Sequence, residues 1–306
     1  MIYQSEEVCV TLLDNGIAQL QFDRAGQSVN KFDQATVISL GKAIDALEAQ
    51  QGIKGLLVTS GKPVFIVGAD IEEFVPLFTA SDEDIASHLT ANNVNFNRIE
   101  QLPYPSCAVI NGFALGGGLE IALACDFRVM SDVAKIGLPE TKLGIMPGWG
   151  GSVRLPRLLG VDEAVTWMAT GAEQKAAKAL SAGAVDAVST LDDLASVALT
   201  TLQGAIDGQL NYEQRRQVKT SPMPLNPTEA MMTFFTTKAM VAQQAGKNYP
   251  APVTVVSAIE EGHAMGLDDA LKVELASFIS LAKTDVAAAL VGIFLSDQLL
   301  AKKAKK

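Results

Sequence analysis

Two glutamates in apolar, glycine-rich surroundings have the clearest capacity for chemistry in this sequence. Glu120 lies in a run of mostly apolar residues, 119–125, directly after three consecutive glycines at 116–118. Glu140 follows Pro139 in a second apolar stretch that is rich in glycine. A carboxylate is costly to bury unless it is paired or used, and burial raises its pKa toward the range that suits acid–base catalysis. Both glutamates are therefore candidate proton-transfer groups.

The glycine loop before Glu120 could bind a developing negative charge. Residues 106–110 form a short apolar run typical of a buried strand, and Asn111-Gly112 ends it. The residues after the loop predict a helix, whose first N–H groups lack partners within the helix and whose dipole adds partial positive charge. Glycines let a substrate approach the backbone, so this turn can form an oxyanion hole. Together with two carboxylates, it suits proton transfer at a carbon next to a thioester carbonyl.

Each of these features has an ordinary structural explanation when it is taken alone. A glycine triplet usually marks a loop, and a glutamate near a helix start usually serves the helix terminus. The combination of loop, helix start and two carboxylates is much less common. The prediction of a proton-transfer site is therefore based on the combination and not on any single feature.

Composition bounds the class of protein. The chain has 306 residues, 48% of them hydrophobic, which is enough for a large core and one or two domains. A net charge of −10 argues against general nucleic-acid binding. Three widely spaced cysteines and the isolated His88 and His263 show no metal-binding spacing. The sequence shows neither a signal peptide nor an apolar run of membrane-spanning length, so we expect no integral membrane segment and a cytoplasmic location.

The order of predicted elements indicates an α/β fold. Runs at 8–13 and 17–22 flank Asp14-Asn15-Gly16 and predict a hairpin, and Asp33 is a good N-cap for a helix to about residue 48. Strand patterns at 55–59, 106–110 and 127–130 alternate with helical patterns, which favours a largely parallel sheet. Ligands in such folds lie beyond the carboxyl ends of strands, where Ala69 and Gly117 are expected.

The carboxyl-terminal third reads differently. Helical patterns dominate from residue 191 on, and the polar segment 208–227, with three prolines and several basic residues, is the best candidate for a linker. We therefore predict a core at 1–190 and a helical tail and linker region at 191–306.

Three motifs in the same order resemble those of the crotonase (enoyl-CoA hydratase/isomerase) superfamily. They are Phe65-Ile66-Val67-Gly68-Ala69-Asp70-Ile71, then Asn111-Gly112 with Gly116-Gly117-Gly118-Leu119-Glu120, then Pro139-Glu140 with Leu143-Gly144 and Pro147-Gly148-Trp149-Gly150-Gly151. The resemblance implies a crotonase-like fold of ββα spiral repeats with a helical carboxyl-terminal region. Nearly all of the chain is similar to the amino-terminal hydratase part of multifunctional α-subunits of bacterial fatty-acid oxidation complexes. Because a dehydrogenase module follows that part, we expect either a piece of a longer protein or a naturally short one.

The resemblance also implies roles for particular residues. The substrate would be a 2-enoyl-CoA, with water added reversibly across its double bond. Glu120 would act as the base on water and Glu140 would deliver the proton to the α-carbon, while the N–H groups of Ala69 and Gly117 form the oxyanion hole. Further substrate-binding candidates are Gly68, Asp70, Gly116 and Trp149, although Asp70 could equally be only a helix cap. Leu119 and Trp149 replace a common cysteine and phenylalanine, and both changes are apolar.

Alternative functions remain open at this point. One is enoyl-CoA isomerisation, on the same site or alone. Another is a binding and assembly module that docks acyl-CoA and partner subunits with poor turnover. Expected partners are a β-oxidation thiolase subunit or further copies of this chain. We expect no cofactor besides the acyl-CoA substrate, since residues 148–151 lack the strand, spacing and acidic residue of a dinucleotide-binding motif.

Overall fold

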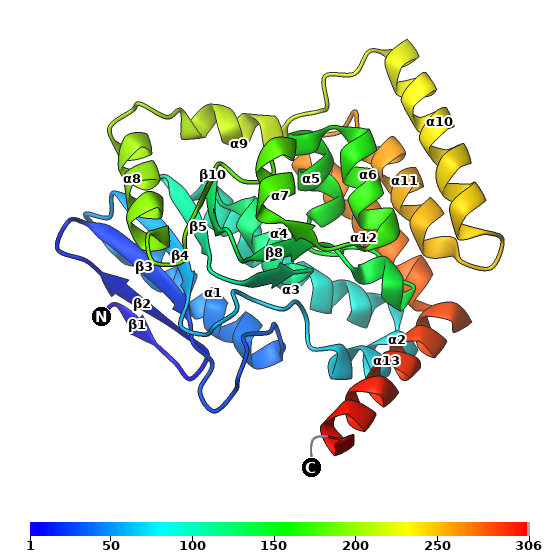
Figure 1. The fold of residues 1–306 in the computed structure, drawn as a ribbon, viewed down its shortest axis with the longest axis horizontal. Coiled ribbons are helices and arrows are strands. Elements are labelled where there is room, and N and C mark those ends of the chain that lie inside the picture. The colour runs from blue at the N-terminus through cyan, green and yellow to red at the C-terminus, as the bar shows by residue number, and fades with distance from the viewer. Residues whose placement is uncertain (305–306) are drawn as a thin grey trace.

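The larger of two sheets has seven strands in the order β1-β2-β3-β4-β5-β7-β10, as seen in the computed structural model, which describes residues 1–304 (Figure 1). Lys305 and Lys306, the end of the predicted tail, lie outside the described residues. The strands are β1 (Tyr3–Gln4), β2 (Val8–Leu12), β3 (Ile17–Phe22), β4 (Gly55–Ser60), β5 (Ser106–Ile110), β7 (Phe127–Ser131) and β10 (Ala187–Ser189). The predicted hairpin is the antiparallel pair β2–β3, and all pairs from β3 to β10 are parallel, so the predicted largely parallel sheet is confirmed.

Both faces of the central strands β4, β5 and β7 are covered, which explains their largely apolar sequences. Side chains alternate between the faces along each strand. In β4, Leu57 packs with helix α8 (Leu194–Ile206), whereas Leu56 and Val58 join the main core on the other face. That main core includes helices α1 (Gln34–Ala49) and α3 (Asp82–Gln101). Asp33 caps α1 as predicted, accepting a hydrogen bond from the N–H of Thr36.

The smaller sheet joins segments of the chain that share one local arrangement. It contains β6 (Phe113–Leu115), β8 (Lys135–Gly137) and β9 (Gln174–Lys175). Ile66 makes a parallel bridge to Ala114 of β6, and Ala114 is in parallel register with Ile136 of β8. Each of these three residues follows a strand of the larger sheet, namely β4, β5 or β7, and each precedes a helical segment. The chain thus forms successive strand–strand–helix units, as the predicted ββα repeats require.

Short and medium helices either form the helical part of these units or come after them in the chain. They are the 3-10 helices η1 (Ile71–Glu73) and η2 (Glu140–Leu143), and the α-helices α2 (Phe74–Thr79), α4 (Gly117–Ala124), α5 (Gly151–Leu159), α6 (Val161–Thr170) and α7 (Ala176–Ala182). Helix α4 is buried along its whole length, which fits its apolar sequence.

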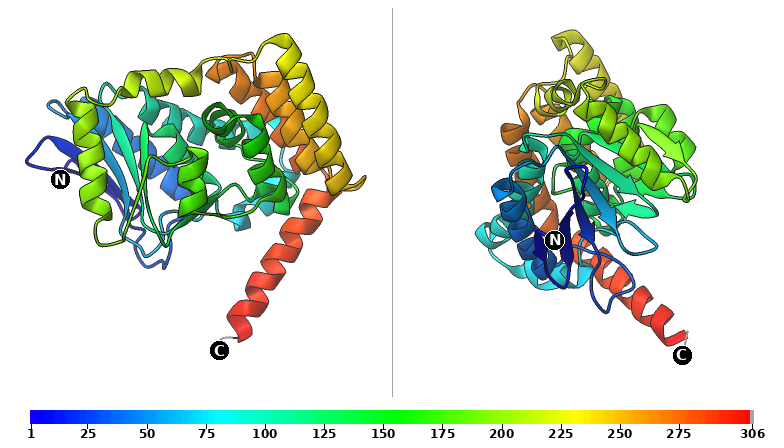
Figure 2. Two further views of the ribbon diagram at one scale, coloured as in Figure 1. Left: turned by 45° about the horizontal axis from the view of Figure 1, so that its top comes forward. Right: turned by 90° about the vertical axis from the view of Figure 1, so that its left-hand side faces the viewer.

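The carboxyl-terminal helices lie beside the units that carry the glutamates. They are α10 (Pro227–Ala245), α11 (Pro250–Gly262), α12 (Leu267–Ala282) and α13 (Asp285–Ala304). Helix α12 packs against α3, α5 and α11, whereas α13 contacts η2 and α2 near its start and then extends away from the body (Figure 2). Within residues 1–304 no single helix has both the length and the hydrophobicity of a membrane span; α12 and α13 meet that test only as a pair bent by 76°.

The segment predicted as a linker is instead firmly attached to the core. Residues 208–227 contain helix α9 (Tyr212–Thr220), where Arg216 forms an ion pair with the buried Asp126. Lys219 is completely buried, and its ammonium group donates to three carbonyl groups at the end of α4. The polar composition of this segment thus reflects buried ion pairs and hydrogen bonds as well as solvation. The division near residue 190 stays a prediction.

Candidate active site

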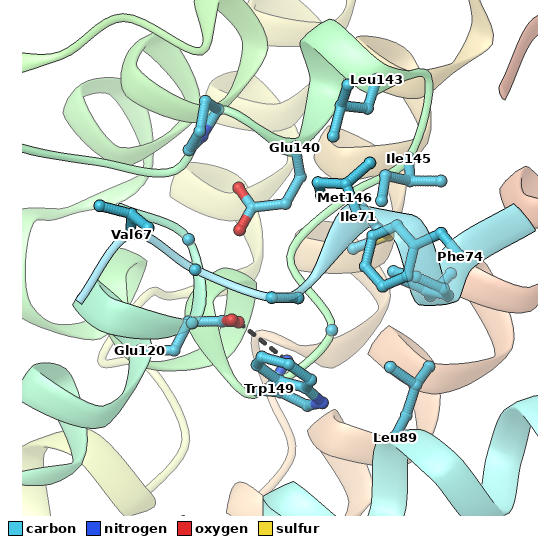
Figure 3. A pocket seen from close by; sticks show the side chains of 17 residues that line it. Val67, Ile71, Phe74, Leu89, Glu120, Glu140, Leu143, Ile145, Met146 and Trp149 are labelled. Carbon is cyan, nitrogen blue, oxygen red and sulfur yellow. Dashed lines mark hydrogen bonds between the residues drawn. The ribbon is translucent and has the colours of Figure 1, made fainter. Parts of the chain in front are cut away.

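The repeated units bring three turn segments to one pocket. Ile66, Ala114 and Ile136 are neighbours across the smaller sheet, and Ala69, Gly117 and Pro139 each lie three residues beyond one of them. Because the strands are parallel, these segments leave the sheet at the same edge. They line a pocket with about 500 Å³ of empty space, including its opening to solvent (Figure 3). Its apolar wall consists of Val67, Ile71, Phe74, Leu89, Leu143, Ile145, Met146 and Phe278.

Glu120 enters this pocket from the first turn of α4. The side chain is buried, and Oε1 accepts hydrogen bonds of 2.8 Å from the backbone N–H groups of both Trp149 and Gly151. Helix α4 starts in close contact with the preceding unit, since a Cβ at Gly118 would lie 2.1 Å from the carbonyl oxygen of Ile66. Glycine at 118 is thus required for Glu120 to reach this position.

Glu140 reaches into the same pocket from η2, directly after Pro139 (Figure 3). Its Oε2 atom is buried and has no hydrogen-bond partner within residues 1–304. A Cβ at Gly116 would lie 2.9 Å from Oε1 of Glu140, so the glycine loop makes room for this carboxyl group. Removal from water raises the pKa of Glu140 to about 8, so that it holds a proton at neutral pH.

The two carboxyl groups influence each other. Burial raises the pKa of Glu120 well above its usual value, and the negative charges of Glu140 and Glu274 add to the effect. The two backbone N–H groups act in the opposite direction and favour the ionised form. No Lys, Arg or His side chain is among the pocket-lining residues. Burial and mutual repulsion therefore disfavour the state in which both carboxyl groups are ionised, and the two groups titrate as a pair.

Two backbone N–H groups at the pocket are free to bind an oxyanion. The carbonyl of Gly68 accepts from the N–H of Phe32, and the carbonyl of Gly116 accepts from the N–H of Glu120. In a trans peptide group the N–H points in the opposite direction to the carbonyl oxygen. The N–H that follows each of these two carbonyl groups therefore points away from the hydrogen-bond partner of that carbonyl. The N–H groups of Ala69 and Gly117 accordingly donate to no acceptor within residues 1–304. Gly68 and Gly116 have φ values of +98° and +52°, a region that strongly favours glycine.

Trp149 forms one wall beside Glu120. Its ring is buried against Phe32 and Phe96, with ring centroids 5.6 and 6.2 Å away in edge-to-face arrangements. The side chain lines the pocket, as do Gly68 and Gly116, so three of the four further candidates border the same space as the glutamates.

Asp70 is placed differently. It caps η1 by accepting from the N–H of Glu72, and it forms an ion pair with Lys31. It does not line the pocket. The helix-cap interpretation describes what the carboxylate does here, and a contact with substrate stays a prediction.

Two residues of helix α12 near the pocket were not among the predicted site residues. Glu274 is buried beneath the Trp149 segment, and Phe278 lines the pocket. The missed signal was a glutamate within an apolar stripe at helical spacing, formed by Ala270, Leu271, Phe278 and Leu281. An acidic residue on the core face of a helix needs a specific partner, which the stripe does not reveal.

The described part of the chain offers no metal site. No group of three or more His, Cys, Asp or Glu side chains in residues 1–304 is arranged to bind a metal ion. All three cysteines are free thiols, and Cys107 and Cys125 are buried as predicted.

Comparison with known proteins agrees with this geometry. Residues 13–248 match the model of the family described as enoyl-CoA hydratase/isomerase. Proteins named fatty acid oxidation complex subunit alpha from Pseudomonas paraeruginosa and Pseudomonas aeruginosa are 54% identical over 100% of this chain and 43% of their own length. The chain thus spans less than half the length of these relatives.

Solved structures show the same fold. An enoyl-CoA hydratase from Bacillus halodurans matches with a TM-score of 0.69 and 21% identity over 94% of this chain and 99% of its own. An enoyl-CoA hydratase/isomerase from Xanthobacter autotrophicus matches with a TM-score of 0.69 and 23% identity over 99% and 97% of the two chains. These likenesses confirm the predicted crotonase-like fold. With a family match over most of its length, this chain belongs to the enoyl-CoA hydratase/isomerase family.

Proposed function

We propose that this chain is a 2-enoyl-CoA hydratase of fatty-acid β-oxidation. The observation that carries the proposal is the arrangement of the pocket. Two carboxyl groups without a basic neighbour in the lining face the same space as two unpaired backbone N–H groups, between apolar walls. The relatives that are named as subunits of a fatty acid oxidation complex support the β-oxidation context.

In this proposal, the thioester oxygen of the substrate accepts hydrogen bonds from Ala69 and Gly117. Both donors are strongest when the oxygen carries the enolate-like charge that develops as a nucleophile attacks the β-carbon. Each preorganised donor of this kind contributes roughly 3–4 kcal/mol of transition-state stabilisation. The apolar walls exclude water around the acyl chain and strengthen these interactions.

The two carboxyl groups complete the addition of water. Ionised Glu120 accepts a proton from a water molecule as its oxygen forms a bond to the β-carbon. Protonated Glu140 donates its proton to the α-carbon as the enolate collapses to the thioester. Water is thus added across the double bond, and the proton then redistributes within the pair to restore the starting state. The pKa of about 8 keeps Glu140 protonated at neutral pH, as this role requires.

The alternatives differ in what they need from the site. Isomerisation moves one proton between carbons and needs a single carboxyl group, so both carboxyl groups favour hydration, with isomerisation as a second activity of the same site. A binding module without turnover would need neither. We also propose a β-oxidation thiolase subunit as a partner, with assembly from copies of this chain as the alternative, and a cytoplasmic location.

The test is the loss of conjugated enoyl-thioester absorbance with a short and a long 2-enoyl-CoA. We expect Glu120→Gln and Glu140→Gln each to reduce kcat by about 100-fold or more, because general acid–base groups contribute factors of 10² to 10⁴. Glu83→Gln, at an exposed position of α3, is the matched control and should behave as the unchanged protein does. Circular dichroism and thermal unfolding establish that each variant is folded.

Two results would contradict the hydratase proposal. Tight binding of acyl-CoA without turnover by the unchanged protein would indicate the binding module. Conversion of a 3-enoyl-CoA to the conjugated isomer, without hydration of the 2-enoyl-CoA, would indicate an isomerase.

A further inference from the structure

Two carboxylates hold four successive backbone N–H groups in alternation. Glu120 Oε1 accepts from Trp149 and Gly151, both at 2.8 Å. Glu274 Oε1 accepts from Gly150 at 2.6 Å, and Oε2 accepts from Ser152 at 3.0 Å. The Ser152 hydroxyl also donates to Oε2 of Glu274 at 2.6 Å. The segment 149–152, at the start of α5, is therefore held by one carboxylate from α4 and one from α12.

The mechanism does not use Glu274, although the residue is almost fully buried. Its side chain is 1% exposed, and it does not line the pocket. The nearby Arg154 does not neutralise it by direct pairing, since that guanidinium forms its ion pair with Glu100 at 2.9 Å. A buried carboxylate without an ion-pair partner is costly, and hydrogen bonds from backbone N–H groups are what offset that cost here.

We propose that Glu274 is a positioning residue for Glu120, because it fixes the segment 149–152 so that the N–H groups of Trp149 and Gly151 face Glu120. The inference rests on the proposed function, since it assigns Glu120 as the base. It gives the helical carboxyl-terminal region a direct part in the active site: α12 supplies both Phe278 to the pocket and Glu274 behind it.

We call this arrangement, in which Glu120 and Glu274 hold the segment 149–152, the clamp. It acts through the orientation of the backbone N–H groups. Successive peptide groups at the start of α5 must present their N–H groups to two different carboxylates, which leaves little freedom for Gly150, whose φ is +91°. If Gly150 and Ser152 lose their acceptor, this first turn can rotate, and the two donors to Glu120 move with it. Misplacement of catalytic groups by about 1 Å is sufficient to reduce rates about 100-fold.

Glu274 also acts on the catalytic pair by its charge. Its negative charge raises the pKa of both Glu120 and Glu140. Burial raises the pKa of Glu274 itself to about 7, and its hydrogen bonds and Arg154 oppose that rise. Removal of the charge should therefore lower the pKa values of the catalytic pair.

Several other ionisable groups on the helices around α12 are engaged elsewhere or exposed. On α5, Arg157 donates to the carbonyl groups of Gly262 and Met265. On α11, Glu260 pairs with Lys238 and Glu261 is exposed. On α13, Asp285 is exposed. On α3, Glu100 is neutralised by Arg154 and Lys219, and Arg98 pairs with Asp45 and Glu48.

The first experiment is the pH dependence of kcat and kcat/KM for Glu274→Gln. We expect kcat to fall about 10- to 100-fold with KM within about twofold, because base positioning is lost while the acyl pocket is kept. The alkaline limb of the kcat/KM profile, which reports protonated Glu140, should move to lower pH, because the negative charge of Glu274 is lost. Asp269→Asn removes a charge from an exposed position of the same helix, and its profile should match that of the unchanged protein. A reduced kcat without a shift in either limb would assign Glu274 a structural role only and overturn the proposal.

Glu274→Asp separates the effect of the position of the carboxylate from the effect of its negative charge. It is also the variant to use if Glu274→Gln does not fold. Aspartate keeps the charge but withdraws the carboxylate by one methylene group. The expected result is a reduced kcat with the alkaline limb of the profile in place, because the charge beside Glu140 is kept. A kcat equal to that of the unchanged protein would overturn the proposal.

Residue-resolved amide hydrogen exchange tests the clamp without any turnover. In Glu274→Asp, exchange should become faster at Trp149 and Gly151 as well as at Gly150 and Ser152, because release of one set of donors loosens the other. Faster exchange at Gly150 and Ser152 alone would contradict the coupling. If the unchanged protein shows no hydration but exchange behaves as expected, the proposed function fails while the clamp stands.

Discussion

The indole ring of Trp149 lies directly against Gly117. A Cβ added at residue 117 would lie 2.4 Å from Cζ3 and 2.6 Å from Cε3 of the ring. The same tryptophan donates its backbone N–H to Glu120. One contact therefore connects the glycine proposed for the oxyanion hole with the residue whose N–H group binds Glu120, the proposed base, and the space between them admits no side chain.

Gly117→Ala should accordingly impair both folding and activity. The added methyl group must displace the indole ring, and overpacking of this kind costs about 1–3 kcal/mol of unfolding free energy. We expect kcat/KM to fall about 100-fold because the N–H of residue 117 and the N–H of Trp149 both move. Urea denaturation and the hydratase assay measure the two effects. Gly292→Ala is the matched control, since a Cβ there meets no atom within 4 Å in helix α13, and a gain of up to about 1 kcal/mol is expected.

Glu140→Gln should stabilise the protein in a pH-dependent way. The folded-state pKa of about 8 lies above the ordinary value of 4.5, so the folded protein binds more protons than the unfolded chain between these pH values. Stability of the unchanged protein must then fall as pH rises through this window, and glutamine has no such loss. The variant should be more stable by a few kcal/mol near pH 8 and by much less near pH 5.

Thermal unfolding at several pH values between 5 and 9 measures this difference. Glu83→Gln serves as the control with an exposed carboxylate and should show no such trend. A stability difference between the Glu140→Gln variant and the unchanged protein that stays constant across this range would contradict the raised pKa.

Lys219→Met should destabilise the fold strongly. The ammonium group of Lys219 is buried with Glu100 at 2.8 Å, and it also donates to the carbonyls of residues 123–125 at 2.8 or 2.9 Å. Removal of one partner from a buried ion pair costs about 3–5 kcal/mol. The urea midpoint should fall accordingly, whereas Lys272→Met, which removes an exposed ion pair with Asp269, should change stability by less than about 1 kcal/mol. Equal changes in the urea midpoint for the two substitutions would show that the buried ion pair contributes no more to stability than the exposed one.

Phe278→Leu should shift the preferred acyl chain length upward. The ring of Phe278 lines the pocket and contacts Phe74 edge to face, with centroids 6.4 Å apart. A smaller side chain leaves more apolar space in the pocket for the acyl chain. Each additional methylene group of substrate that is buried there contributes about 0.8 kcal/mol of binding free energy. The ratio of kcat/KM for a long to a short 2-enoyl-CoA should rise by roughly fourfold for each methylene group accommodated. Phe235→Leu, at a ring that is 76% exposed on α10, should leave the ratio unchanged.

The sequence by itself determined the local elements and the identity of the main candidate residues. The hairpin around Asp14 to Gly16, the cap at Asp33 and the strand at Ser106–Ile110 depend on short-range turn chemistry and apolar patterning, and all three are present. Glu120 and Glu140 stood out because a carboxylate in an apolar, glycine-rich run has few structural uses. Order and spacing of the motifs also identified the family.

Only the tertiary structure decided how distant segments share the site. The parallel register of Ile66, Ala114 and Ile136 brings Ala69, Gly117 and Glu140 to one pocket, and such pairing is a long-range property that no local pattern specifies. The same holds for two polar residues of the carboxyl-terminal third. The burial of Lys219 and Glu274 is explained only by their hydrogen-bond partners, which lie about 95 and 124 residues away in sequence.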